Sequence, residues 1–553
     1  MKAYKSISRS AEYRIKGAFS QPCYFDWRTC AKVLFFLAVQ TNAWAQPFAA
    51  PKLVSAVRLP FTSSASPAVG DINGDGRPDI AVTVDHIGIA THEVDDPSNP
   101  NAVRVYTWKG AGLALLPGWP QSTRDATLGL ALADLNRNGR SEVLAACGQD
   151  YAPSLMEKSG LWITARLYVW EGSGRPLSPW FPSPGAGVIG QAAGHAYAAP
   201  SVGDLNNDGS LEIIQSSQGA WEQGTFRRGN LRLWSHDGRL LGQTQSDTAN
   251  LPWRVYPSFS VETPPVLADL NGDGRTEVIA ASFDGRVYAW NSEGRPVPGW
   301  MPSTGAVTQT ENRVPIRCGI SAADLDGDGR DELVAGANDG ALYAWDHDGS
   351  VLWKWKHPAS GVSITSGLAA GDTGSGWLIA AGDSAGTIRA WDANGRLLWS
   401  SQTTPGQPVM AEPALGDVNA DGVVDVVTVG TDGYVYAFDG SKGTLIWQVP
   451  TLWAPTREGM RLEPALGAPA LCDLRGNGRL CVIIATASRY VADIPTRDWR
   501  GTGHLLVYDC GPGTANARTP WPQYRGEPRR TGQGVETTGT RRPGPAQTLR
   551  GSQ

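Results

Sequence analysis

The segment Asp269-Leu-Asn-Gly-Asp-Gly-Arg-Thr-Glu277 places oxygen-bearing side chains at alternate positions and then turns at a glycine. The apolar run Val278-Ile-Ala-Ala281 follows directly, and the alternating run Val287-Tyr-Ala-Trp290 comes a few residues later. Short apolar or alternating runs bounded by Gly and Asp are typical of β-strands joined by tight turns. The segment therefore predicts a polar loop set among short antiparallel strands.

This unit recurs eight times, and the first Asp of each copy is Asp71, Asp134, Asp204, Asp269, Asp324, Asp372, Asp417 or Asp473. Each copy continues into an alternating run that ends in an aromatic residue: Trp108, Trp170, Trp234, Trp290, Trp345, Trp391, Phe438 or Tyr508. In every copy except the third, a second Trp opens another short run: Trp119, Trp180, Trp300, Trp353, Trp399, Trp447 or Trp521. Each unit thus supplies four short strands, which we name A to D.

Four antiparallel strands in each of eight units predict an all-β fold, a β-propeller with eight four-stranded blades. A ring of seven blades, an irregular ring and a solenoid of stacked units are the alternatives. The recurring Trp residues are expected to pack between neighbouring blades. Ring closure is open at this point: either Trp521 and its neighbours complete blade eight, or residues 52–62 add its outer strand.

The N-terminal segment has the order of a secretory signal peptide. Basic residues precede the apolar run Val33-Leu-Phe-Phe-Leu-Ala-Val39, and the small-x-small pattern Ala43-Trp-Ala45 follows it. We therefore expect a signal peptide over residues 1–45, cut near Ala45, and a secreted or periplasmic protein. No other segment reaches 18 apolar residues, so no membrane span is expected.

The propeller is expected to occupy residues 46–530, and residues 531–553, rich in Gly, Thr, Arg and Pro, to form a flexible tail. The net charge is −5, and removal of the seven positive and two negative charges of the signal segment gives −10. A protein that binds nucleic acid through its backbone usually carries a basic footprint. This charge balance therefore argues against a nucleic-acid partner.

Six of the eight loops between strands A and B, the A–B loops, follow the pattern Asp-x-[Asp/Asn]-x-[Asp/Asn]-Gly-x-x-[Asp/Glu]. Ca²⁺ prefers six to eight oxygen ligands at about 2.3–2.6 Å, and alternate positions 1, 3 and 5 point into one concavity. The Gly at position 6 permits the turn that brings position 9 back. We expect up to six structural Ca²⁺ sites, whose ligands are Asp71, Asn73, Asp75, Asp79, Asp134, Asn136, Asn138, Glu142, Asp204, Asn206, Asp208, Glu212, Asp269, Asn271, Asp273, Glu277, Asp324, Asp326, Asp328, Glu332, Asp417, Asn419, Asp421 and Asp425. The loop of blade two has two carboxylates beside Arg137 and is expected to bind most weakly.

Two copies depart from the pattern. The sixth reads Asp372-Thr-Gly-Ser-Gly-Trp377 and lacks the acidic set. The eighth has Arg475 at position 3, where it is expected to replace the ion by pairing with Asp473. Cys472 and Cys481 bracket the eighth loop, and a disulfide between them is one possibility. The other is that strand alternation directs them to opposite faces.

These loops and strands resemble the FG-GAP (VCBS) repeats of integrin α-subunit propellers and their bacterial relatives, over roughly residues 60–525. The resemblance implies a metal in each A–B loop that matches the pattern, where it staples a blade. The runs Gly285-Arg-Val-Tyr-Ala-Trp290 and Gly340-Ala-Leu-Tyr-Ala-Trp345 also resemble quinoprotein-type propeller repeats. That second likeness concerns the blade and implies no quinone cofactor.

The loops between strands B and C, the B–C loops, are enlarged in blades eight, one, two and three, which are adjacent in a closed ring. Successive turns alternate between the two faces of a propeller, so the B–C and D–A loops lie opposite the A–B loops. In integrin-like propellers the B–C and D–A face binds the ligand, which favours a glycan or a protein on this face. The candidate ligand-binding residues are His86, His92, Tyr151, Trp162, Trp221, Arg227, Arg489, Tyr490, Arg497 and Trp499.

The sequence carries no nucleophile elbow, no His-Glu-x-x-His and no P-loop. The favoured interpretation is a secreted, calcium-stabilised binding or interaction protein. The alternative is an enzyme that resembles the rhamnogalacturonan-lyase propellers, which also carry Asp-rich loops. A lyase needs a base with a tuned pKa, which His86, His92, His195 or His504 would have to supply.

Overall fold

The computed structural model describes residues 49–63, 65–85, 101–123, 127–148, 164–177, 189–193, 198–217, 220–222, 225–227, 230–243, 261, 263–282, 284–300, 309–310, 314–456, 459–487, 503–514, 519, 522–523 and 526. The chain divides into two units, residues 1–47 and 48–553, and the fold below is that of the second unit. The predicted signal segment and the predicted tail lie outside the described residues. No helix long and apolar enough to cross a membrane occurs among the described residues.

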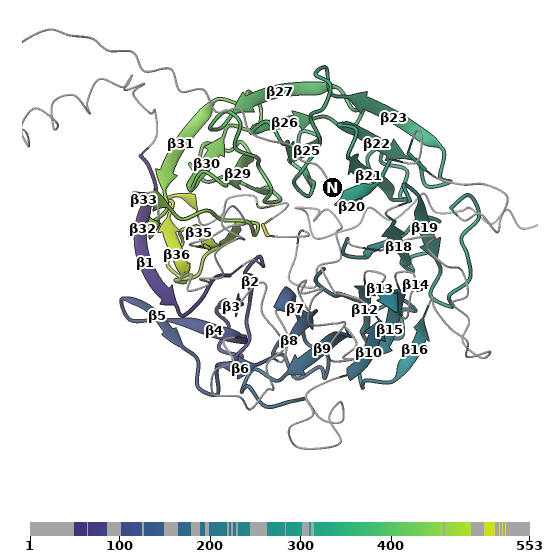
Figure 1. Ribbon diagram of the computed structural model, residues 1–553, viewed down its shortest axis with the longest axis horizontal. Helices are drawn as coiled ribbons and strands as arrows, with labels where there is room; N and C mark the ends of the chain where they lie inside the picture. The colour runs from purple at the N-terminus through teal and green to yellow at the C-terminus, as the bar shows by residue number, and fades with distance from the viewer. Residues whose placement is uncertain are drawn as a thin grey trace, which may run out of the picture. The chain divides into compact units, whose positions relative to one another are not determined.

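The second unit is a β-propeller whose eight sheets follow one another round a ring (Figure 1). The first four blades contain β2 (Ala68–Gly70), β3 (Asp79–Val84), β4 (Ala102–Lys109), β5 (Gly112–Leu115) and β6 (Gln121–Ser122); β7 (Thr127–Ala133), β8 (Glu142–Cys147), β9 (Thr164–Trp170) and β10 (Ile189–Ala193); β11 (Ser201–Gly203), β12 (Glu212–Ser217), β15 (Asn230–Ser235) and β16 (Leu240–Gln243); and β17 (Val266–Ala268), β18 (Glu277–Ala281) and β19 (Val287–Trp290).

The last four blades are built in the same order along the chain. They contain β20 (Ile316–Ala323), β21 (Glu332–Ala337), β22 (Ala341–Trp345) and β23 (Val351–Lys356); β24 (Ala369–Asp372), β25 (Trp377–Gly382), β26 (Thr387–Trp391) and β27 (Leu397–Gln402); β28 (Ala414–Gly416), β29 (Asp425–Val429), β30 (Tyr434–Phe438) and β31 (Leu445–Pro450); and β34 (Ala470–Cys472), β35 (Cys481–Ala485), β36 (Gly503–Asp509) and β1 (Lys52–Leu59).

The prediction of eight antiparallel blades is confirmed, with local variations. Blade four shows three strands among the described residues, and an isolated bridge between Trp290 and Pro296 marks its fourth position. Blade one has a fifth strand, β6, which pairs with β4. Two separate hairpins lie outside the blades: β13 (Ala220–Glu222) pairs with β14 (Thr225–Arg227), and β32 (Trp453–Thr456) pairs with β33 (Gly459–Leu462).

Ring closure uses both ends of the propeller sequence. Strand β1 pairs antiparallel with β36, so residues from the start of the propeller form the outer strand of blade eight. At the inner strands, the backbone N–H of Leu471 in blade eight donates to Pro522, and the Gln523 side chain bonds both backbone polar groups of Val69 in blade one. The alternative in which residues 52–62 add the outer strand is therefore confirmed, and the C-terminal segment joins the same two blades from inside.

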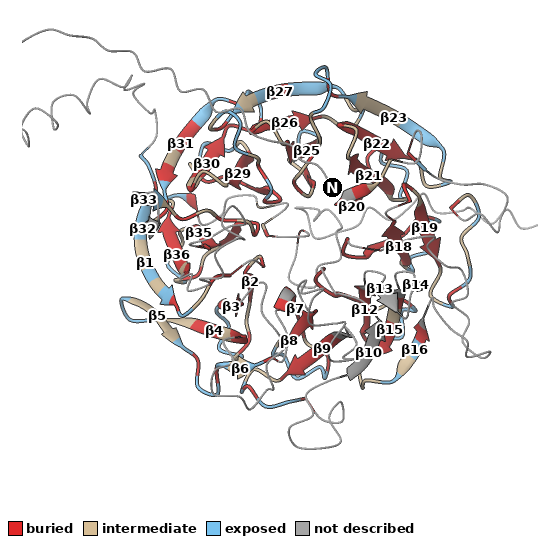
Figure 2. Cartoon of the chain, viewed as in Figure 1, coloured by how far each residue is buried: buried red, intermediate tan, exposed pale blue. Residues whose placement is uncertain are grey.

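Burial separates the inner strands from the outer ones (Figure 2). All five residues of β26 are buried, whereas β27, the outer strand of the same blade, is largely exposed except for Trp399. Inner strands are covered on both faces by neighbouring blades, so their sequences are almost continuously apolar. Outer strands face solvent on one side and alternate.

Four of the recurring Trp residues, at or after the outer strands, join neighbouring blades as predicted, and they do so with a hydrogen bond as well as by packing. Each indole N–H donates to a backbone carbonyl in the C–D turn of the next blade: Trp119 to Gly172 at 3.0 Å, Trp300 to His347 at 2.9 Å, Trp353 to Ala393 at 2.8 Å and Trp399 to Gly440 at 2.7 Å. The indole face needs a glycine opposite it. A Cβ atom at Gly395 would lie 2.4 Å from the Trp353 ring.

Candidate functional site

The first Asp of each A–B loop holds the backbone of its own turn. In blade five, Asp324 Oδ1 accepts the N–H of Gly327 at 2.7 Å and Oδ2 accepts the N–H of Gly329 at 3.0 Å. Gly329, at position 6, has a φ of 87°, a conformation that favours glycine. The Asp and the Gly therefore form the turn together, before any ion is considered.

The acid at position 9 is buried under each loop. In blade five the Glu332 side chain is fully buried, and its Oε2 atom accepts the backbone N–H of Leu325 at 2.7 Å. Its other oxygen has no hydrogen-bond partner, and the same is true of Oδ1 of Asp425 in blade seven. These two oxygens are buried acceptors, and a buried carboxylate requires a positive partner.

Burial raises the pKa of every position-9 acid. The pKa rises to about 8 for Glu332 and to about 9 for Asp425. Desolvation is the main cause in both, and repulsion from the neighbouring loop carboxylates adds to it. One backbone hydrogen bond to each acid acts in the opposite direction and lowers the pKa. The pKa rises to about 7 for Glu142, Glu212 and Glu277, and that of Asp79 is raised for the same reason. The protein thus buries carboxyl groups in a place where their charged form is poorly compensated.

Blade five has the cleanest set of oxygen ligands. One carboxylate oxygen from each of Asp324, Asp326 and Glu332 lies within 4.8 Å of the others, a spacing suited to one metal ion. In other loops position 3 is Asn, whose amide fills part of this space: the Nδ2 atom of Asn271 donates to Glu277 at 3.0 Å. Because Asp326 has no such donor, the blade-five loop offers oxygens alone, which fits a hard divalent cation.

The loop of blade two is the most weakly acidic of the six. Its position 3 is Asn136, whose Nδ2 donates to Glu142 at 2.7 Å. The Arg137 guanidinium reaches away to the Ser210 hydroxyl of blade three at 3.0 Å. The expectation that this loop binds a cation most weakly stays a prediction.

Neighbouring A–B loops touch one another. The Ser141 N–H of blade two donates to the Asp71 carbonyl of blade one at 3.0 Å. Asn207 of blade three donates to the Gly274 carbonyl of blade four at 2.7 Å, and the Asp269 N–H of blade four donates to Asp331 of blade five at 2.8 Å. A charge placed in one loop therefore acts on the boundary between blades as well as on its own blade.

The eighth loop keeps the backbone frame and changes its charges. Asp473 accepts the N–H of Asn477 at 3.1 Å and of Gly478 at 2.8 Å, as the first Asp does elsewhere. The predicted pairing of Arg475 with Asp473 is wrong. Arg475 instead pairs at 2.5 Å with Asp509 on β36, and its guanidinium lies 5.2 Å from the centre of the Trp108 ring in blade one. The Asp473 oxygens are used by the backbone, whereas the nearly buried Asp509 requires a cation.

A pocket of about 330 Å³ lies between blades one and two beside their A–B loops. Its lining residues are Ile72, Asn73, Leu116, Pro117, Asn138, Arg140, Glu142, Glu171, Gly172, Ser173 and Arg175. Arg175 is paired with Glu171 at 2.8 Å. The pocket therefore borders two of the predicted metal loops, on the face opposite the enlarged loops.

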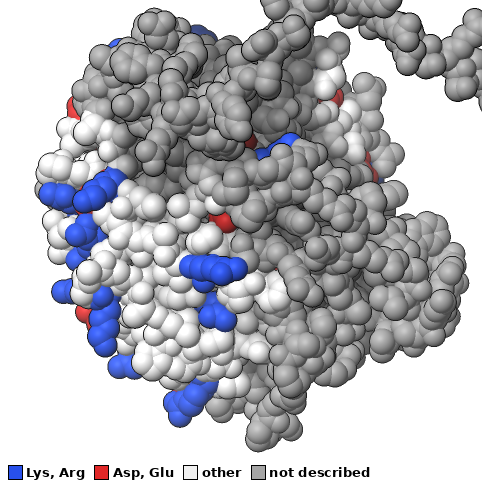
Figure 3. Space-filling view, turned by 60° about the vertical axis from the view of Figure 1, so that its left-hand side comes forward, with Lys and Arg blue, Asp and Glu red and all other residues white. Residues whose placement is uncertain are grey.

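The outer wall near β1 carries basic side chains. Lys52 and Arg58 of β1 are exposed. Figure 3 shows Lys and Arg gathered on the described part of this side of the molecule, with few Asp or Glu among them. The negative net charge of the chain is thus unevenly distributed, and this wall favours anionic neighbours.

The sequence-predicted ligand face falls largely outside the described residues. This applies to His86, His92, Tyr151, Trp162, Arg489, Tyr490, Arg497 and Trp499. Trp221 and Arg227 lie on β13 and β14, where Trp221 pairs with Phe226 and Arg227 with Ala220, but their side chains are outside the description. The ligand assignments stay predictions.

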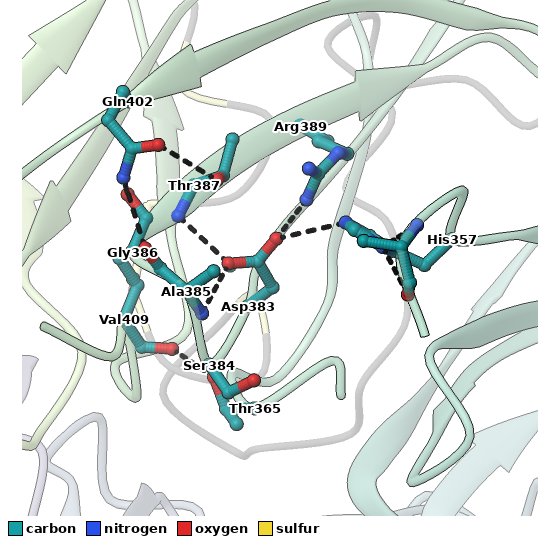
Figure 4. A network of polar contacts seen from close by, with 12 residues as sticks. His357, Thr365, Asp383, Ser384, Ala385, Gly386, Thr387, Arg389, Gln402 and Val409 are labelled. Carbon is teal, nitrogen blue, oxygen red and sulfur yellow. Dashed lines mark hydrogen bonds and ion pairs between the residues drawn. The ribbon is translucent and has the colours of Figure 1, made fainter. Parts of the chain in front are cut away.

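Blade six has a buried ionic network on this face that the sequence reasoning missed (Figure 4). The Asp383 carboxylate is fully buried, pairs with Arg389 and lies 3.6 Å from His357 Nε2 at the end of blade five. It also accepts the N–H groups of Ala385 and Thr387, each at 2.9 Å. The network joins two blades, and the Asp383 carboxylate is matched by Arg389 and two backbone N–H groups, which indicates a structural role.

The sequence of the repeat contains a feature from which this network could have been predicted. Blades four, five and seven pair a B–C turn Asp with a strand-C Tyr hydroxyl: Asp284 with Tyr288, Asp339 with Tyr343, and Asp432 with Tyr436. In blade six these two positions are Ala385 and Arg389, and Asp383 supplies the carboxylate from two residues earlier. In blade six, the Arg in place of the repeated Tyr therefore accompanies a buried acid two residues before the usual Asp position.

Of the four histidines considered as a lyase base, His504 is the one that the structure describes. Its Nδ1 atom lies 2.9 Å from the buried Glu463 carboxylate, which also accepts the Thr486 hydroxyl. His86, His92 and His195 are outside the described residues. The described histidine is thus tied to a contact between blades seven and eight.

Comparison with known proteins agrees with the repeat. The FG-GAP repeat model matches residues 64–106, the FG-GAP-like repeat model matches residues 269–335, and the outer membrane protein assembly factor BamB model matches residues 309–502. No curated protein sequence matches.

Two solved structures share the fold at low identity. The V. cholerae biofilm matrix protein Bap1 is 15% identical over 86% of this chain and 94% of its own, with a TM-score of 0.50. Saccharomyces cerevisiae Sqt1 is 13% identical over 84% of this chain and 100% of its own, also with a TM-score of 0.50. These likenesses concern the fold alone. The two FG-GAP repeat models and the eight blades lead to one conclusion: the chain is a β-propeller that contains FG-GAP repeats.

Proposed function

We propose that this propeller is an exported binding protein whose blades are stabilised by Ca²⁺ in up to six A–B loops. Its ligand, a glycan or a protein, would be held by the enlarged B–C loops of blades eight, one, two and three. The observation that carries the calcium proposal is the oxygen cluster of Asp324, Asp326 and Glu332, in which a fully buried carboxylate oxygen has no hydrogen-bond partner.

The energetic argument for a cation rests on the position-9 acids. A protein gains little from burying a carboxyl group whose pKa is displaced to about 7 or above, as at Glu277 and Glu332, unless a positive charge compensates the ionised form. A bound Ca²⁺ would supply that charge and use the ligand positions of the loop. Because neighbouring loops touch, the same charge would also strengthen the contact between blades.

The binding role is supported by how the described ring uses its polar groups. On the B–C and D–A face, Asp383 and Arg389 pair with each other and His504 pairs with Glu463, so these side chains have structural partners. A rigid ring of this kind holds its loops apart and leaves them available for recognition. Loops that combine aromatic residues with Arg suit a polar glycan or a protein surface.

Calcium is tested by thermal unfolding of the purified protein after EDTA treatment, with and without added Ca²⁺. A site at 100 times its Kd stabilises by about 2.7 kcal/mol, so several sites together should raise the melting temperature by about 10 °C. Calorimetric titration should give a stoichiometry that falls by one in Glu332→Gln. Equal melting temperatures in EDTA and Ca²⁺ would remove the calcium proposal.

Ligand binding is tested on a glycan array in Ca²⁺, beside an ultraviolet assay for lyase products on pectin. Binding without product formation is expected, and binding should weaken in Trp162→Ala and Trp499→Ala. A control is Leu352→Ala, because this exposed side chain lies on the outer strand β23 of blade five, away from the enlarged loops. Turnover that is lost when His86 or His92 is replaced would instead establish the lyase alternative.

A further inference from the structure

The blade-eight loop differs from the others at two positions that face each other. In the register of the A and B strands, Cys472 pairs with Cys481. The equivalent pairs in other blades are Gly70 with Asp79, Ala133 with Glu142, Gly203 with Glu212, Ala268 with Glu277, Ala323 with Glu332, and Gly416 with Asp425. Blade eight thus replaces both members of a small residue–buried acid pair with cysteines.

The register settles the question that the sequence left open. Residues directly opposite each other in an antiparallel pair project to the same side of the sheet. Cys472 and Cys481 accordingly pack in one apolar cluster with Leu474 and Ile483. Because the Leu471 N–H donates away from β35, to Pro522, the backbone polar groups of Cys472 face β35. Such a hydrogen-bonded pair has its Cα atoms about 5.5 Å apart.

That Cα separation falls inside the range of about 4.4–6.8 Å that disulfides span, and the Cβ atoms, about 4.5–5.5 Å apart in a directly opposed pair, must close to about 3.5–4.5 Å when the bond forms. We propose that Cys472 and Cys481 form a disulfide that closes the A–B loop of blade eight, at the position where six of the other loops have a buried acid. In the structure both residues are thiols. The covalent bond would join the same two strand ends that position 9 joins elsewhere, and it requires no ion.

The third cysteine of this blade is the natural competitor, and its placement argues against it. Cys481 pairs with Asp509 across β35 and β36, so Cys510 is one residue out of register. Cys510 packs against the cluster of Val482 and Tyr508, on the other side of the sheet from Cys472. It is expected to remain a thiol.

The oxidation is a thiol–disulfide exchange with a small disulfide such as oxidised glutathione. One Cys thiolate attacks a glutathione sulfur and releases one reduced glutathione. The second Cys thiolate then attacks the mixed disulfide and releases another, so the two cysteine protons end on two glutathione thiols. Burial raises the pKa of the Cys481 thiol to about 12, which slows attack in the folded blade. Exchange is therefore expected during folding.

The test starts from reduced, unfolded protein that is refolded with reduced and oxidised glutathione, unfolded again, alkylated without reductant and digested with trypsin. Cleavage after Arg475 and Arg479 separates the two cysteines, so the disulfide would link peptides 462–475 and 480–489. The linked mass should be present in nearly all molecules and vanish on reduction. It should persist in Cys510→Ser and be absent in Cys472→Ser.

Recovery of alkylated Cys472 and Cys481 from the folded wild-type protein would overturn the proposal, as would a linkage that includes Cys510. The measurement on wild-type protein needs no variant to fold. It is also independent of the calcium proposal, because refolding can be performed in EDTA or in Ca²⁺ and the linkage is expected in any condition in which the ring folds.

Discussion

The A–B loops of blades five and eight have the same backbone frame and opposite chemistry inside it. In both, the first Asp accepts N–H groups of the turn, through Asp324 in one and Asp473 in the other. Blade five then adds Asp326 and the buried Glu332, whereas blade eight has Arg475 and Cys481 at those positions. The backbone of the turn therefore does not depend on the residues at positions 3 and 9. The interaction that closes the loop can differ between blades while the turn keeps its shape.

The largest expected difference between the two loops is in how the stability of the protein depends on pH in the absence of metal. The pKa of Glu332 rises from its ordinary value of 4.5 to about 8. The unfolded chain therefore loses this proton at lower pH than the folded chain does, and the free energy of unfolding falls as pH rises from about 4.5 towards 8. The loss is at most about 5 kcal/mol for this group, at about 1.4 kcal/mol per pKa unit.

In EDTA the melting temperature should consequently fall between pH 5 and pH 9, with contributions from Glu142, Glu212, Glu277 and Asp425, whose pKa values are raised in the same direction. In Ca²⁺ the fall should disappear, because the ion binds the ionised form. Cys481, with its pKa raised to about 12, stays neutral over this range. Parallel curves in the two buffers would contradict the proposed role of the acids.

The effect of Glu332→Gln on the melting temperature should have opposite signs in EDTA and in Ca²⁺. In EDTA near pH 8 it removes a poorly compensated buried carboxylate and should raise the melting temperature by a few degrees. In Ca²⁺ it removes one site and should cost about 3 kcal/mol at saturating ion. The matched control is Cys481→Ser, at the equivalent position of blade eight and measured in reductant. Its effect should be equal in both buffers.

Replacement of the first Asp tests what the loops share. In EDTA, Asp324→Ala and Asp473→Ala each remove a charged acceptor of turn N–H groups and should each cost about 2 kcal/mol. The measurement is thermal unfolding of the two variants side by side. A cost confined to blade five would show that the blade-eight frame is held by something other than its Asp.

The smallest expected change in stability concerns the ion pair between Arg475 and Asp509. Arg475→Met leaves the nearly buried Asp509 with Arg479, which lies 3.5 Å away. Because the Arg475 side chain is 28% exposed and a second cation remains, we expect a cost of about 1 kcal/mol, seen as a small drop in melting temperature at low salt. Arg479→Met should cost less. A larger loss of stability in Arg479→Met than in Arg475→Met would show that Arg479 is the main partner of Asp509.

The ring, its blade number and the frame of the A–B loops could be predicted from the sequence because each depends on residues a few positions apart. The oxygen-bearing side chains, the Gly at position 6 and the strand periodicity repeat locally. The partner of Arg475 could not be predicted, because Asp509 is 34 residues away in sequence and only packing brings the two together. The Asp383, Arg389 and His357 network depends on contact between two blades for the same reason.

The ligand-binding residues are harder to predict from the sequence, because the enlarged loops differ in length and composition from blade to blade and share no repeating pattern. Ring closure left two candidates because the choice of an outer strand for blade eight depends on a partner at the far end of the chain. The cysteine pair needed the register of β34 and β35 before its direction could be decided.

The pairing of β1 with β36, in which Leu59 lies opposite Gly503, has a consequence for the order of events during synthesis. A chain is made from its N-terminus, so β1 is the first strand of the propeller to emerge and must wait for almost the last one. Through that interval its edge and the apolar side chains of Val54 and Val57 have no partner in blade eight. An unpaired strand edge is a template for aggregation, so the exposure of β1 is expected to last until blade eight has been made.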